Sequence, residues 1–434
     1  MDYQAIYRSK LTDVEGALSL IHDNDIIVGG AVGEEPQACL SQLHTLNGKV
    51  HNIKYMSGLG MCSYPFMIDP ACKETFDYDC IFLLGPGREA HKQGLLNFIP
   101  AHLHNGFRRW TEANGFPNVF IVAVSPMDKH GYFRVPLCVI QERLLLERAD
   151  TIIVEVNPNL PATLGDTQLH VRDVDAILEV DYDIPTLEPG SIDDDDRTIG
   201  SYIAEQVHDG DCIQLGIGGI PDAAAQALMT KHDLGIHTEM IGNSMVDLIE
   251  AGVVTGNKKN VNRGKVIGGF AMGNRRLYDM LDNNPGIELR RGEYVNDPVI
   301  IAQNDNFVSI NTAMCIDLGG QVCSESIGSR QYSGSGGQVD TAVGALHSNG
   351  GHNIIAVKSV KHTKQGVVSS INSQLPLGSV VTLSRNDLDC VVTEYGIAYM
   401  RGRTVRQRVD NLIAVAHPDF RAQLRKDAER LMLW

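Results

Sequence analysis

Short apolar runs rich in β-branched residues alternate with amphipathic segments along most of the chain. The clearest apolar runs cover residues 26–28, 121–124, 152–156, 212–215 and 354–357. Amphipathic stretches between such runs include residues 36–43 and 222–228. Continuous apolar runs are typical of strands buried on both faces, and strands that alternate with helices indicate βαβ units. The pattern therefore predicts an α/β fold with mostly parallel sheets.

The end of the chain predicts two helices. Thr404 and Gln407 have the spacing of a capping box, in which the side chains at the start of a helix satisfy its free N–H groups. An apolar stripe follows at Val405, Val409, Leu412 and Ile413. Pro418 then interrupts the pattern, and a last helix is expected to begin near Asp419.

The chain also contains an internal repeat. Residues 22–33 and 208–219 match at a constant offset, which pairs Asp25 with Asp211, Gly30 with Gly216 and Gly33 with Gly219. Residues 118–131 match 306–320 in the same order, which pairs Asp128 with Asp317 and Gly131 with Gly320. A weaker third match joins residues 81–87 to 266–273. Three matches in one order indicate a duplicated domain.

The expected join is the acidic run of residues 191–197, which follows Pro185 and Pro189 and is typical of an exposed linker. We therefore expect two domains, residues 1–190 and residues 191–434.

Composition narrows the possible partners. The 434 residues are 43% hydrophobic and 21% charged, as in an ordinary globular protein. A net charge of −16 argues against nucleic acid or an anionic membrane as the main partner, although a local basic site for an anionic ligand stays possible.

Cysteine, signal and histidine patterns favour a cytoplasmic protein without a metal. The nine cysteines are scattered, which is typical of reduced thiols. We find no signal-peptide pattern and no apolar run of the roughly 20 residues that span a bilayer. The 15 histidines show no metal-binding spacing, so no metal is expected.

Two glycine-rich stretches suggest ligand contacts. Residues 216–219 (Gly-Ile-Gly-Gly) follow a strand and open a helix, where backbone N–H groups favour anions; a tight turn needed only for the fold is the alternative. The first copy lacks the paired glycines, so we expect the second half to carry the ligand. Residues 332–340 form a denser glycine loop, which could hold an oxyanion or could be a flexible surface loop. We favour the functional interpretation because apolar patterning resumes directly at residues 339–343.

The remaining signal is one carboxylate, Glu239, at the end of an apolar stretch. By itself such a residue is most often a solvated loop end or a helix cap. The surrounding motifs, however, resemble the acetyl-CoA hydrolase/transferase family, in its 4-hydroxybutyrate CoA-transferase-like branch. The matching pieces are 125–126 (Ser-Pro), 128–132 (Asp-Lys-His-Gly-Tyr), 216–221 (Gly-Ile-Gly-Gly-Ile-Pro), 237–240 (His-Thr-Glu-Met), 295–298 (Val-Asn-Asp-Pro), 301–305 (Ile-Ala-Gln-Asn-Asp), 333–340 (Ser-Gly-Ser-Gly-Gly-Gln-Val-Asp), 393–396 (Thr-Glu-Tyr-Gly) and 417–420 (His-Pro-Asp-Phe).

The resemblance implies two tandem CoA-transferase-type (NagB/RpiA-like) α/β domains, which agrees with the repeat, and a homodimer or larger homo-oligomer. It also implies that Glu239 is the catalytic nucleophile and that Asn296 and Gly337 supply oxyanion donors. Coenzyme A would be contacted by Gly216, Ile217, Gly218, Gly219, Ile220, Met314, Gly336 and Ser384. The expected substrates are an acyl-CoA and a small carboxylic acid.

The acceptor acid is the open part of this interpretation. Family members often read Phe/Ile-Ser-Asp-Gly after the Glu-Met pair, whereas residues 241–244 here are Ile-Gly-Asn-Ser. Four arginines could bind a second carboxylate of a dicarboxylic acid, or could be ordinary surface residues: Arg88, Arg108, Arg109 and Arg134. The sequence as a whole is most similar to itaconate/succinyl-CoA transferases, and butyrate or 4-hydroxybutyrate is the alternative acceptor acid. A thioester hydrolase on the same scaffold and a non-catalytic metabolite sensor are the rival functions.

Overall fold

The computed structural model describes residues 2–364 and 366–433, and its contacts divide the chain into two compact units. The first unit comprises Met1–Leu187 and Ile267–Val295, and the second comprises Glu188–Val266 and Asn296–Trp434. The chain passes from the first unit to the second after Leu187, close to the boundary expected at residues 190 and 191. The segment Ile267–Val295, however, groups with the first unit although it lies far along the chain. No local sequence pattern marks such a return.

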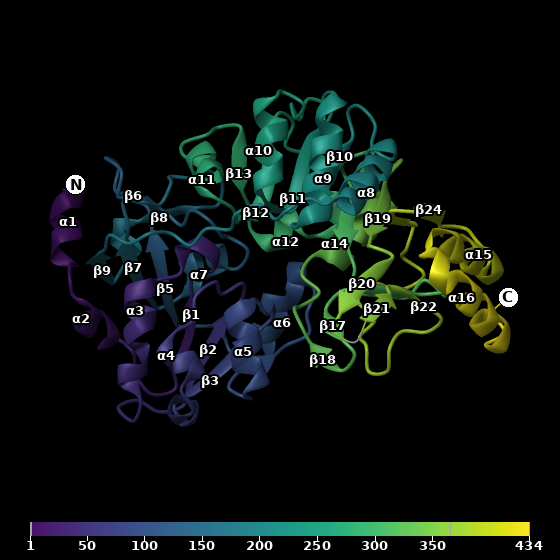
Figure 1. Ribbon diagram of the computed structural model, residues 1–434. Coiled ribbons are helices and arrows are strands. Elements are labelled where there is room, and N and C mark those ends of the chain that lie inside the picture. Colours follow the sequence, from purple (N-terminus) through teal and green to yellow (C-terminus); the bar gives the residue numbers. More distant parts are fainter. Residues whose placement is uncertain (1, 365, 434) are drawn as a thin grey trace. The chain divides into compact units, whose positions relative to one another are not determined.

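The first unit is built on a parallel seven-stranded sheet (Figure 1). Its strands are β1 (Ile26–Gly29), β2 (Ile53–Ser57), β3 (Phe76–Cys80), β4 (Asn97–Phe98), β5 (Val119–Val124), β7 (Thr151–Val156) and β9 (Ala176–Glu179), in the order β4-β3-β2-β1-β5-β7-β9. The antiparallel pair β6 (Tyr132–Arg134) and β8 (Gln168–His170) lies outside this sheet. The helices of the continuous part are α1 (Tyr3–Ser9), α2 (Val14–Leu18), α3 (Gln37–Gln42), α4 (Pro65–Ile68), α5 (Gly85–Lys92), α6 (Leu103–Asn114) and α7 (Glu142–Arg148).

The returning segment adds further elements to the first unit. It begins within β12 (Val266–Ala271) and continues through α11 (Arg275–Leu281), β13 (Ile287–Leu289) and α12 (Gly292–Val295). Backbone hydrogen bonds fasten it: Val139 N–H donates to the Gly269 carbonyl at 3.0 Å, and Asp166 N–H donates to the Leu289 carbonyl at 2.8 Å.

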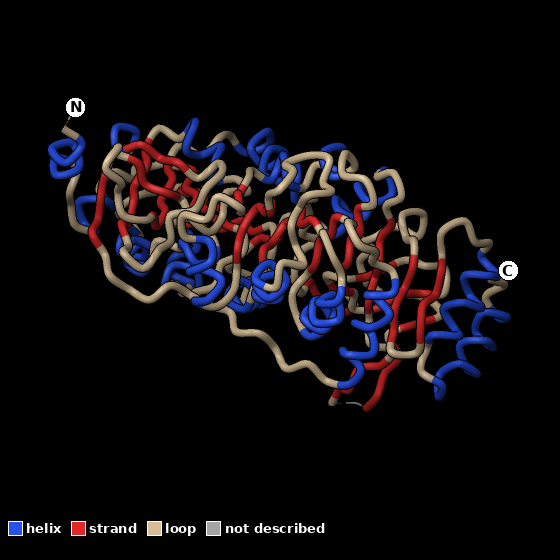
Figure 2. Tube along the Cα trace, turned by 90° about the horizontal axis from the view of Figure 1, so that it is seen from above, coloured by secondary structure: helices blue, strands red, loops and turns tan. Residues whose placement is uncertain are grey.

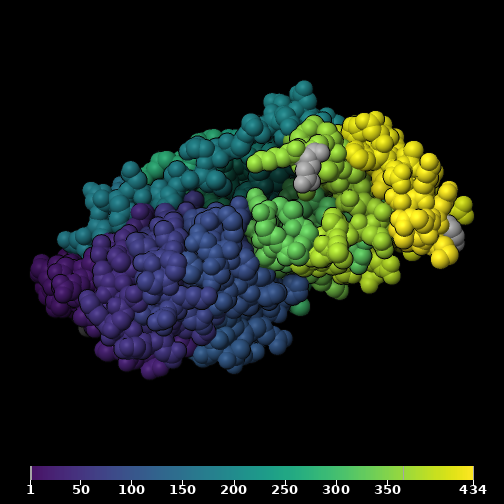
Figure 3. All heavy atoms as spheres, turned by 60° about the horizontal axis from the view of Figure 1, so that its bottom comes forward, coloured from purple at the N-terminus to yellow at the C-terminus, as the bar shows by residue number. Residues whose placement is uncertain are grey.

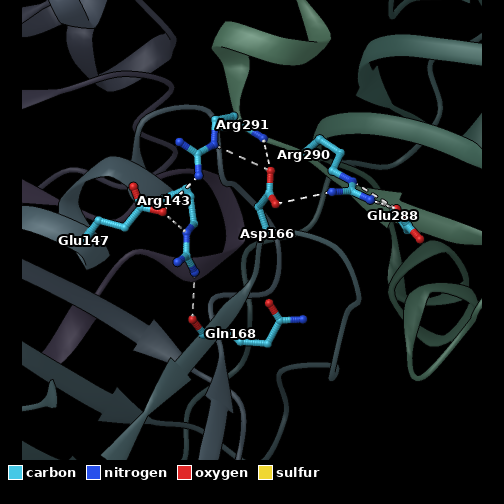
Figure 4. Close-up of polar contacts among 7 residues, drawn as sticks. All are labelled: Arg143, Glu147, Asp166, Gln168, Glu288, Arg290 and Arg291. Atoms are coloured by element: carbon cyan, nitrogen blue, oxygen red, sulfur yellow. Dashed lines mark hydrogen bonds and ion pairs between the residues drawn. The ribbon is translucent and has the colours of Figure 1, made fainter. Parts of the chain in front are cut away.

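A network of ion pairs holds the end of the same segment (Figure 4). Arg291 donates its backbone N–H to Asp166 Oδ2 at 3.0 Å, and Arg290 Nη1 lies 3.5 Å from Asp166 Oδ1. The Arg291 guanidinium also reaches Glu147 Oε1 at 2.9 Å, an oxygen that Arg143 Nε shares at 2.7 Å. Because these side chains are partly buried and share partners, the network holds this segment better than isolated surface pairs would. The segment ends at Val295, one residue before Asn296.

The second unit repeats the plan. Its main strands are β10 (Cys212–Leu215), β11 (Gly235–Ile241), β14 (Phe307–Thr312), β19 (His352–Ala356), β23 (Cys390–Thr393) and β24 (Gly396–Tyr399), and within this unit they follow the order β11-β10-β14-β19-β23-β24. These pairings are parallel except the last, in which β24 runs antiparallel to β23. Short strands form additional small sheets: β15 (Cys315–Asp317), β16 (Val322–Cys323), β17 (Ser326–Ile327), β18 (Arg330–Gln331), β20 (Val360–Thr363), β21 (Gly366–Ser369) and β22 (Ile371–Asn372).

The helices of the second unit are α8 (Asp194–Glu205), α9 (Gly219–Ala227), α10 (Asn243–Glu250), α13 (Pro298–Ile301), α14 (Gln338–His347), α15 (Val405–Val415) and α16 (Pro418–Arg430). Among the described residues, no helix is long and apolar enough to cross a membrane. The predicted α/β class with two mostly parallel sheets is confirmed.

The duplication is visible in local hydrogen bonds. The side chain of Asp25 accepts the His22 N–H at 2.7 Å just before β1, and Asp211 accepts the His208 N–H at 2.7 Å just before β10. Both aspartates therefore close the same turn at the entry to an equivalent strand.

The second repeated motif behaves alike. Asp128 Oδ1 accepts the N–H groups two and four residues later, at 2.8 and 3.0 Å, and Asp317 Oδ1 does the same at 2.9 Å each. The paired glycines, Gly131 and Gly320, both have positive φ, at 85° and 95°. This backbone conformation explains why both copies carry glycine there.

The acidic run at 191–197 is not a free linker, so that expectation is wrong for its second half. Asp193 caps α8 in a capping box with Asp196, and the helix starts at Asp194. Lys358 pairs with Asp193 at 2.6 Å and with Asp196 at 3.0 Å. Negative side chains are favourable at a helix N-terminus. An acidic run that resembles an exposed linker can therefore form the start of a packed helix.

The two terminal helices pack together at the C-terminal end of the chain (Figures 1 and 2) and appear as one block of yellow side chains (Figure 3). The predicted capping box of Thr404 and Gln407 is present. Val409, Leu412 and Ile413 are buried as expected, whereas Val405, in the first turn, is exposed. The last helix starts at Pro418, one residue before the predicted start, because proline suits the first helical position.

Candidate active site

Glu239 lies near the carboxyl end of β11, in the second unit. Its strand neighbours His237, Thr238 and Met240 are buried, whereas Glu239 itself is only partly buried. The side chain is therefore held on a packed strand and still reachable from one side, as a nucleophile requires.

Two donors hold the Glu239 carboxylate. Asn296 Nδ2 donates to Glu239 Oε2 at 3.1 Å, and the Gly337 backbone N–H also donates to the carboxylate. A Cβ atom at Gly337 would lie 1.9 Å from Glu239 Oε2 and 2.1 Å from Asn296 Nδ2. Glycine is therefore required for this approach. The structure thus places the three predicted catalytic residues together, although they lie far apart in sequence.

Gly337 is also the N-cap of α14, so the carboxylate lies against the start of a helix. A polar network fixes that start. Thr341, in the first turn of α14, accepts hydrogen bonds from Ser309 Oγ at 2.9 Å and Asn311 Nδ2 at 3.2 Å, both from β14. Gln338 Nε2 donates to the Thr312 carbonyl at 3.2 Å. These residues had no predicted role, and their polar, uncharged character alone gives no signal of one.

The electrostatics of Glu239 are unusual. Burial raises the pKa of the Glu239 carboxyl to about 7, and the negative charge of Asp340 adds to this shift. The hydrogen bonds from Asn296 and Gly337 oppose it, because they stabilise the charged form. Asp340 is 1% exposed and belongs to the first turn of α14. Asp340 ends the glycine-rich motif of residues 333–340. The sequence did not predict its effect on the pKa of Glu239, because only the fold brings the two residues near one another.

The predicted coenzyme A turn leaves β10 beside this strand. Because β10 and β11 are parallel neighbours, their carboxyl ends meet at one edge of the sheet. Gly218 has φ of 112° and caps α9. A Cβ at Gly219 would lie 2.6 Å from Asp196 Oδ2, so that glycine also serves the packing of α9 against α8. The exposed members of the turn are Ile217 and Gly218, which makes them the most accessible to a ligand.

The other predicted coenzyme A residues are more dispersed. Gly336 precedes the active-site glycine and has φ of 51°. Met314 follows β14 and donates its N–H to the Cys323 carbonyl at 2.9 Å, and Ser384 Oγ accepts the Asn386 N–H at 3.2 Å. Within the part of the chain that the structure describes, the hydrogen bonds to Glu239 come from Asn296 and Gly337 and not from Met314 or Ser384. Their contact with coenzyme A stays a prediction.

The arginines considered for a second substrate carboxylate belong to the first unit. Arg134 lies 3.4 Å from Asp128, inside the repeated turn, and Arg109 lies 4.0 Å from Glu112 on α6. Both contacts agree with the alternative given above, that these arginines are ordinary surface residues and do not bind the substrate.

A carboxylate at a strand end, facing an amide and a helix-capping glycine on a duplicated parallel α/β scaffold, has the parts that acyl transfer from a thioester needs. The fold and site define a CoA-transferase-type enzyme. Residues 1–187 match the acetyl-CoA hydrolase/transferase N-terminal domain, and residues 273–428 match the C-terminal domain of the same family. The chain belongs to the acetyl-CoA hydrolase/transferase family and is a CoA-transferase, as the residue motifs indicated.

Full-length relatives support this membership. The chain is 40% identical to the succinyl-CoA:cyclohexane-1-carboxylate CoA transferase of Geobacter metallireducens, over 99% of this chain and 97% of that one. It is 38% identical to the 4-hydroxybutyrate coenzyme A transferase of Clostridium kluyveri, over 99% of this chain and 100% of that one. The crystal structure of RipA from Yersinia pestis matches with a TM-score of 0.94 at 34% identity, covering 100% of both chains.

Proposed function

We propose that this enzyme moves coenzyme A between an acyl-CoA and a small carboxylic acid by a ping-pong mechanism, with Glu239 as the covalent nucleophile. The observation that carries the proposal is the joint approach of Asn296 and the Gly337 N–H to the Glu239 carboxylate. Their contact with the carboxylate supports the proposal that both donors stabilise the oxyanion formed when Glu239 reacts. The expectation that no metal takes part stays a prediction.

The first half-reaction leaves coenzyme A on the enzyme. The Glu239 carboxylate attacks the thioester carbonyl, and the tetrahedral oxyanion collapses with loss of the coenzyme A thiolate, which gives an acyl-glutamyl anhydride. The thiolate then attacks the glutamyl carbonyl of this anhydride. The C–O bond breaks, the first acid leaves as a carboxylate, and Glu239 becomes a glutamyl-CoA thioester.

The second half-reaction runs the same steps in reverse. The incoming carboxylate attacks the glutamyl-CoA carbonyl and displaces the thiolate, which forms a new anhydride. The thiolate then attacks the acyl carbonyl, so the new acyl-CoA leaves and the Glu239 carboxylate is restored. Each step passes through an oxyanion, and one preorganised donor is worth about 2.7–4 kcal/mol in such a state. Asn296 and Gly337 are the proposed donors.

Binding of the distant part of coenzyme A offsets the poor reactivity of a carboxylate nucleophile. We assign that binding to Gly216, Ile217, Gly218, Gly219, Ile220, Gly336, Met314 and Ser384. The exposure of Ile217 and Gly218, at the carboxyl end of the strand beside β11, supports this assignment.

For the substrates, we propose succinyl-CoA as donor and itaconate as acceptor, with butyrate or 4-hydroxybutyrate as the alternative acid. One relative is named for succinyl-CoA, which supports the proposed donor, and another is named for 4-hydroxybutyrate, which supports the alternative acid. We also propose a homodimer or larger assembly, which light scattering coupled to gel filtration would test.

The covalent intermediate gives the decisive experiment. The enzyme is incubated with succinyl-CoA or butyryl-CoA, treated with borohydride, digested and analysed by mass spectrometry. We expect the adduct or its reduced derivative on the peptide that contains Glu239. Exchange of the trapped coenzyme A into added carboxylates establishes transfer, whereas release to water without an acceptor establishes a hydrolase. Absence of any adduct despite coenzyme A binding and turnover would overturn the mechanism, and binding without turnover would indicate a sensor.

A further inference from the structure

The first turn of α14 brings two carboxylates to one helix end. Glu239 contacts the helix at its N-cap, Gly337, and Asp340 lies three residues further along. Asp340 therefore lies within the first turn after the residue that contacts Glu239, and one helical turn rises by about 5.4 Å. Asp340 is almost completely buried, and Glu239 is partly buried, so water screens the two charges poorly.

In the described part of the chain, the hydrogen-bond donors that contact Glu239 carry no positive charge. The hydrogen-bond donors on Glu239 are the neutral amide of Asn296 and a backbone N–H. Asn311 of β14 donates to Gln214 of β10 at 3.3 Å and to Thr341 of α14 at 3.2 Å, and both amides are neutral. Asp297 follows Asn296, but its side chain caps α13 through the Val299 N–H at 2.8 Å.

A purely structural role for Asp340 is the alternative. Acidic residues are favourable in the first turn of any helix, and Asp222 of α9 and Asp419 of α16 occupy such positions. Asp419 differs in that its side chain is highly exposed, and it contacts His417. Asp340 differs from it by being buried, and its charge acts on the Glu239 carboxyl.

We propose that Asp340 is a positioning residue that acts through Glu239, because its charge disfavours free ionised Glu239 and the repulsion disappears when Glu239 is bonded to acyl or coenzyme A. This inference rests on the function proposed above. In the anhydride and in the glutamyl-CoA thioester the glutamyl group is neutral. Attack on the thioester therefore removes one of two neighbouring buried charges, and the charge leaves with the thiolate or with the released acid.

Two consequences follow for the reaction. The ionised Glu239 carboxylate is more basic than an ordinary one, and a more basic carboxylate is a better nucleophile. The covalent intermediate is also favoured over the free enzyme, because repulsion is present only in the latter. An uncharged residue at position 340 should weaken both effects while the donors Asn296 and Gly337 remain.

The test is the pH dependence of the first half-reaction in Asp340→Asn. Release of the first carboxylic acid from the same acyl-CoA, in a single turnover without acceptor acid, reports conversion of Glu239 into the glutamyl-CoA thioester. In the unchanged enzyme we expect the rate to rise with pH around a midpoint of about 7. In Asp340→Asn we expect the midpoint to move down by about one pH unit, which corresponds to a factor of about ten in the glutamyl-CoA to free-enzyme ratio above pH 7.

Matched variants separate charge from folding. Asp419→Asn removes an acid from the first turn of α16 and should leave the profile unchanged. Asp340→Glu keeps the charge and should keep the midpoint near 7, even if its rate is lower. Asp340→Ser, which also suits a helix start, replaces Asp340→Asn if the latter does not fold.

An unchanged midpoint in the folded, uncharged variants, with rates lowered equally at every pH, would overturn the role of Asp340. Failure of the proposed function is seen separately, because the unchanged enzyme would then form no glutamyl-CoA adduct at Glu239.

Discussion

The two units share a sheet order and several turns, but they differ at the carboxyl end of one strand. In the first unit His51 N–H donates to Asp23 Oδ1 at 2.8 Å before β2, and in the second His232 N–H donates to Asp209 Oδ1 at 2.8 Å before β11. Gly58 follows His51 by as many residues as Glu239 follows His232, so Gly58 is the position of the first unit that is equivalent to Glu239. The scaffold is therefore duplicated, whereas the proposed nucleophile is present in one copy.

Buried carboxylates alone do not mark the active copy. Burial also raises the pKa of Glu35, in the first unit, to about 7. Glu35 accepts hydrogen bonds from the N–H groups of Met61 and Cys62, at 2.7 and 3.0 Å, and from Tyr64 OH at 3.1 Å. Its oxygens accept hydrogen bonds that fix a loop, while Glu239 is more exposed. Accessibility and donor placement therefore separate the proposed nucleophile from a structural carboxylate.

The largest expected effect comes from removing the nucleophile. Glu239→Gln should lower kcat by about 10⁴-fold or more, since the residue forms the covalent bond. Steady-state transfer from succinyl-CoA or butyryl-CoA measures this. In contrast, Glu35→Gln should leave kcat per folded molecule almost unchanged, because the Glu35 carboxylate accepts hydrogen bonds from the loop at Met61 and Cys62. Substantial turnover in purified Glu239→Gln would remove that residue from the mechanism.

Gly337→Ala should have the next largest effect. The added Cβ would lie 1.9 Å from Glu239 Oε2, so the carboxylate or the loop must move. We expect kcat to fall by about 10²–10³-fold, the range for loss of one oxyanion donor. Gly58→Ala is the matched control in the first unit, because its Cβ would approach no described atom closer than 3.4 Å. Equal losses in the two variants would contradict the assignment of chemistry to the second unit.

The raised pKa of Glu239 predicts a pH-dependent stability difference. The ordinary pKa of a glutamate side chain is about 4.3, and well below this pH Glu239 is protonated in both the folded and the unfolded protein. Between about pH 4.3 and 7 the unfolded carboxyl ionises first, so the folded protein loses stability as pH rises. Glu239→Gln avoids this cost. Its Tm should exceed that of the unchanged enzyme by a margin that grows through this window and levels off above pH 7. A constant margin across the window would argue against the raised pKa.

The smallest expected effects come from the shared turns. Asp211→Ala loses the hydrogen bond from His208 N–H, whereas Asp25→Ala loses one from His22 N–H and another from Asn118 Nδ2 at 2.7 Å. At about 1 kcal/mol for each lost bond, Asp25→Ala should be the more destabilising. Urea unfolding measures both, with kcat per folded molecule expected to change little. A larger loss for Asp211→Ala would show that the two turns are not equivalent.

Much of the fold was readable because its signals are local. The predicted runs at 26–28, 121–124, 152–156, 212–215 and 354–357 correspond to β1, β5, β7, β10 and β19, since a buried strand needs apolar residues in succession. The helical stretches at 36–43 and 222–228 overlap α3 and α9. The motifs around Glu239, Asn296 and Gly337 were also visible, as short segments whose residue types suit acyl transfer.

The sequence by itself determined the βα alternation, the duplication and the family motifs, because each depends on residues close together in the chain or on a repeated pattern. Only the tertiary structure decided that Ile267–Val295 groups with the first unit, that the acidic run begins α8, and that Asp340 acts on Glu239. Burial and the field of a charge depend on distance in space. Residues 101 positions apart, such as Glu239 and Asp340, become neighbours only when β11 and α14 are packed in one unit.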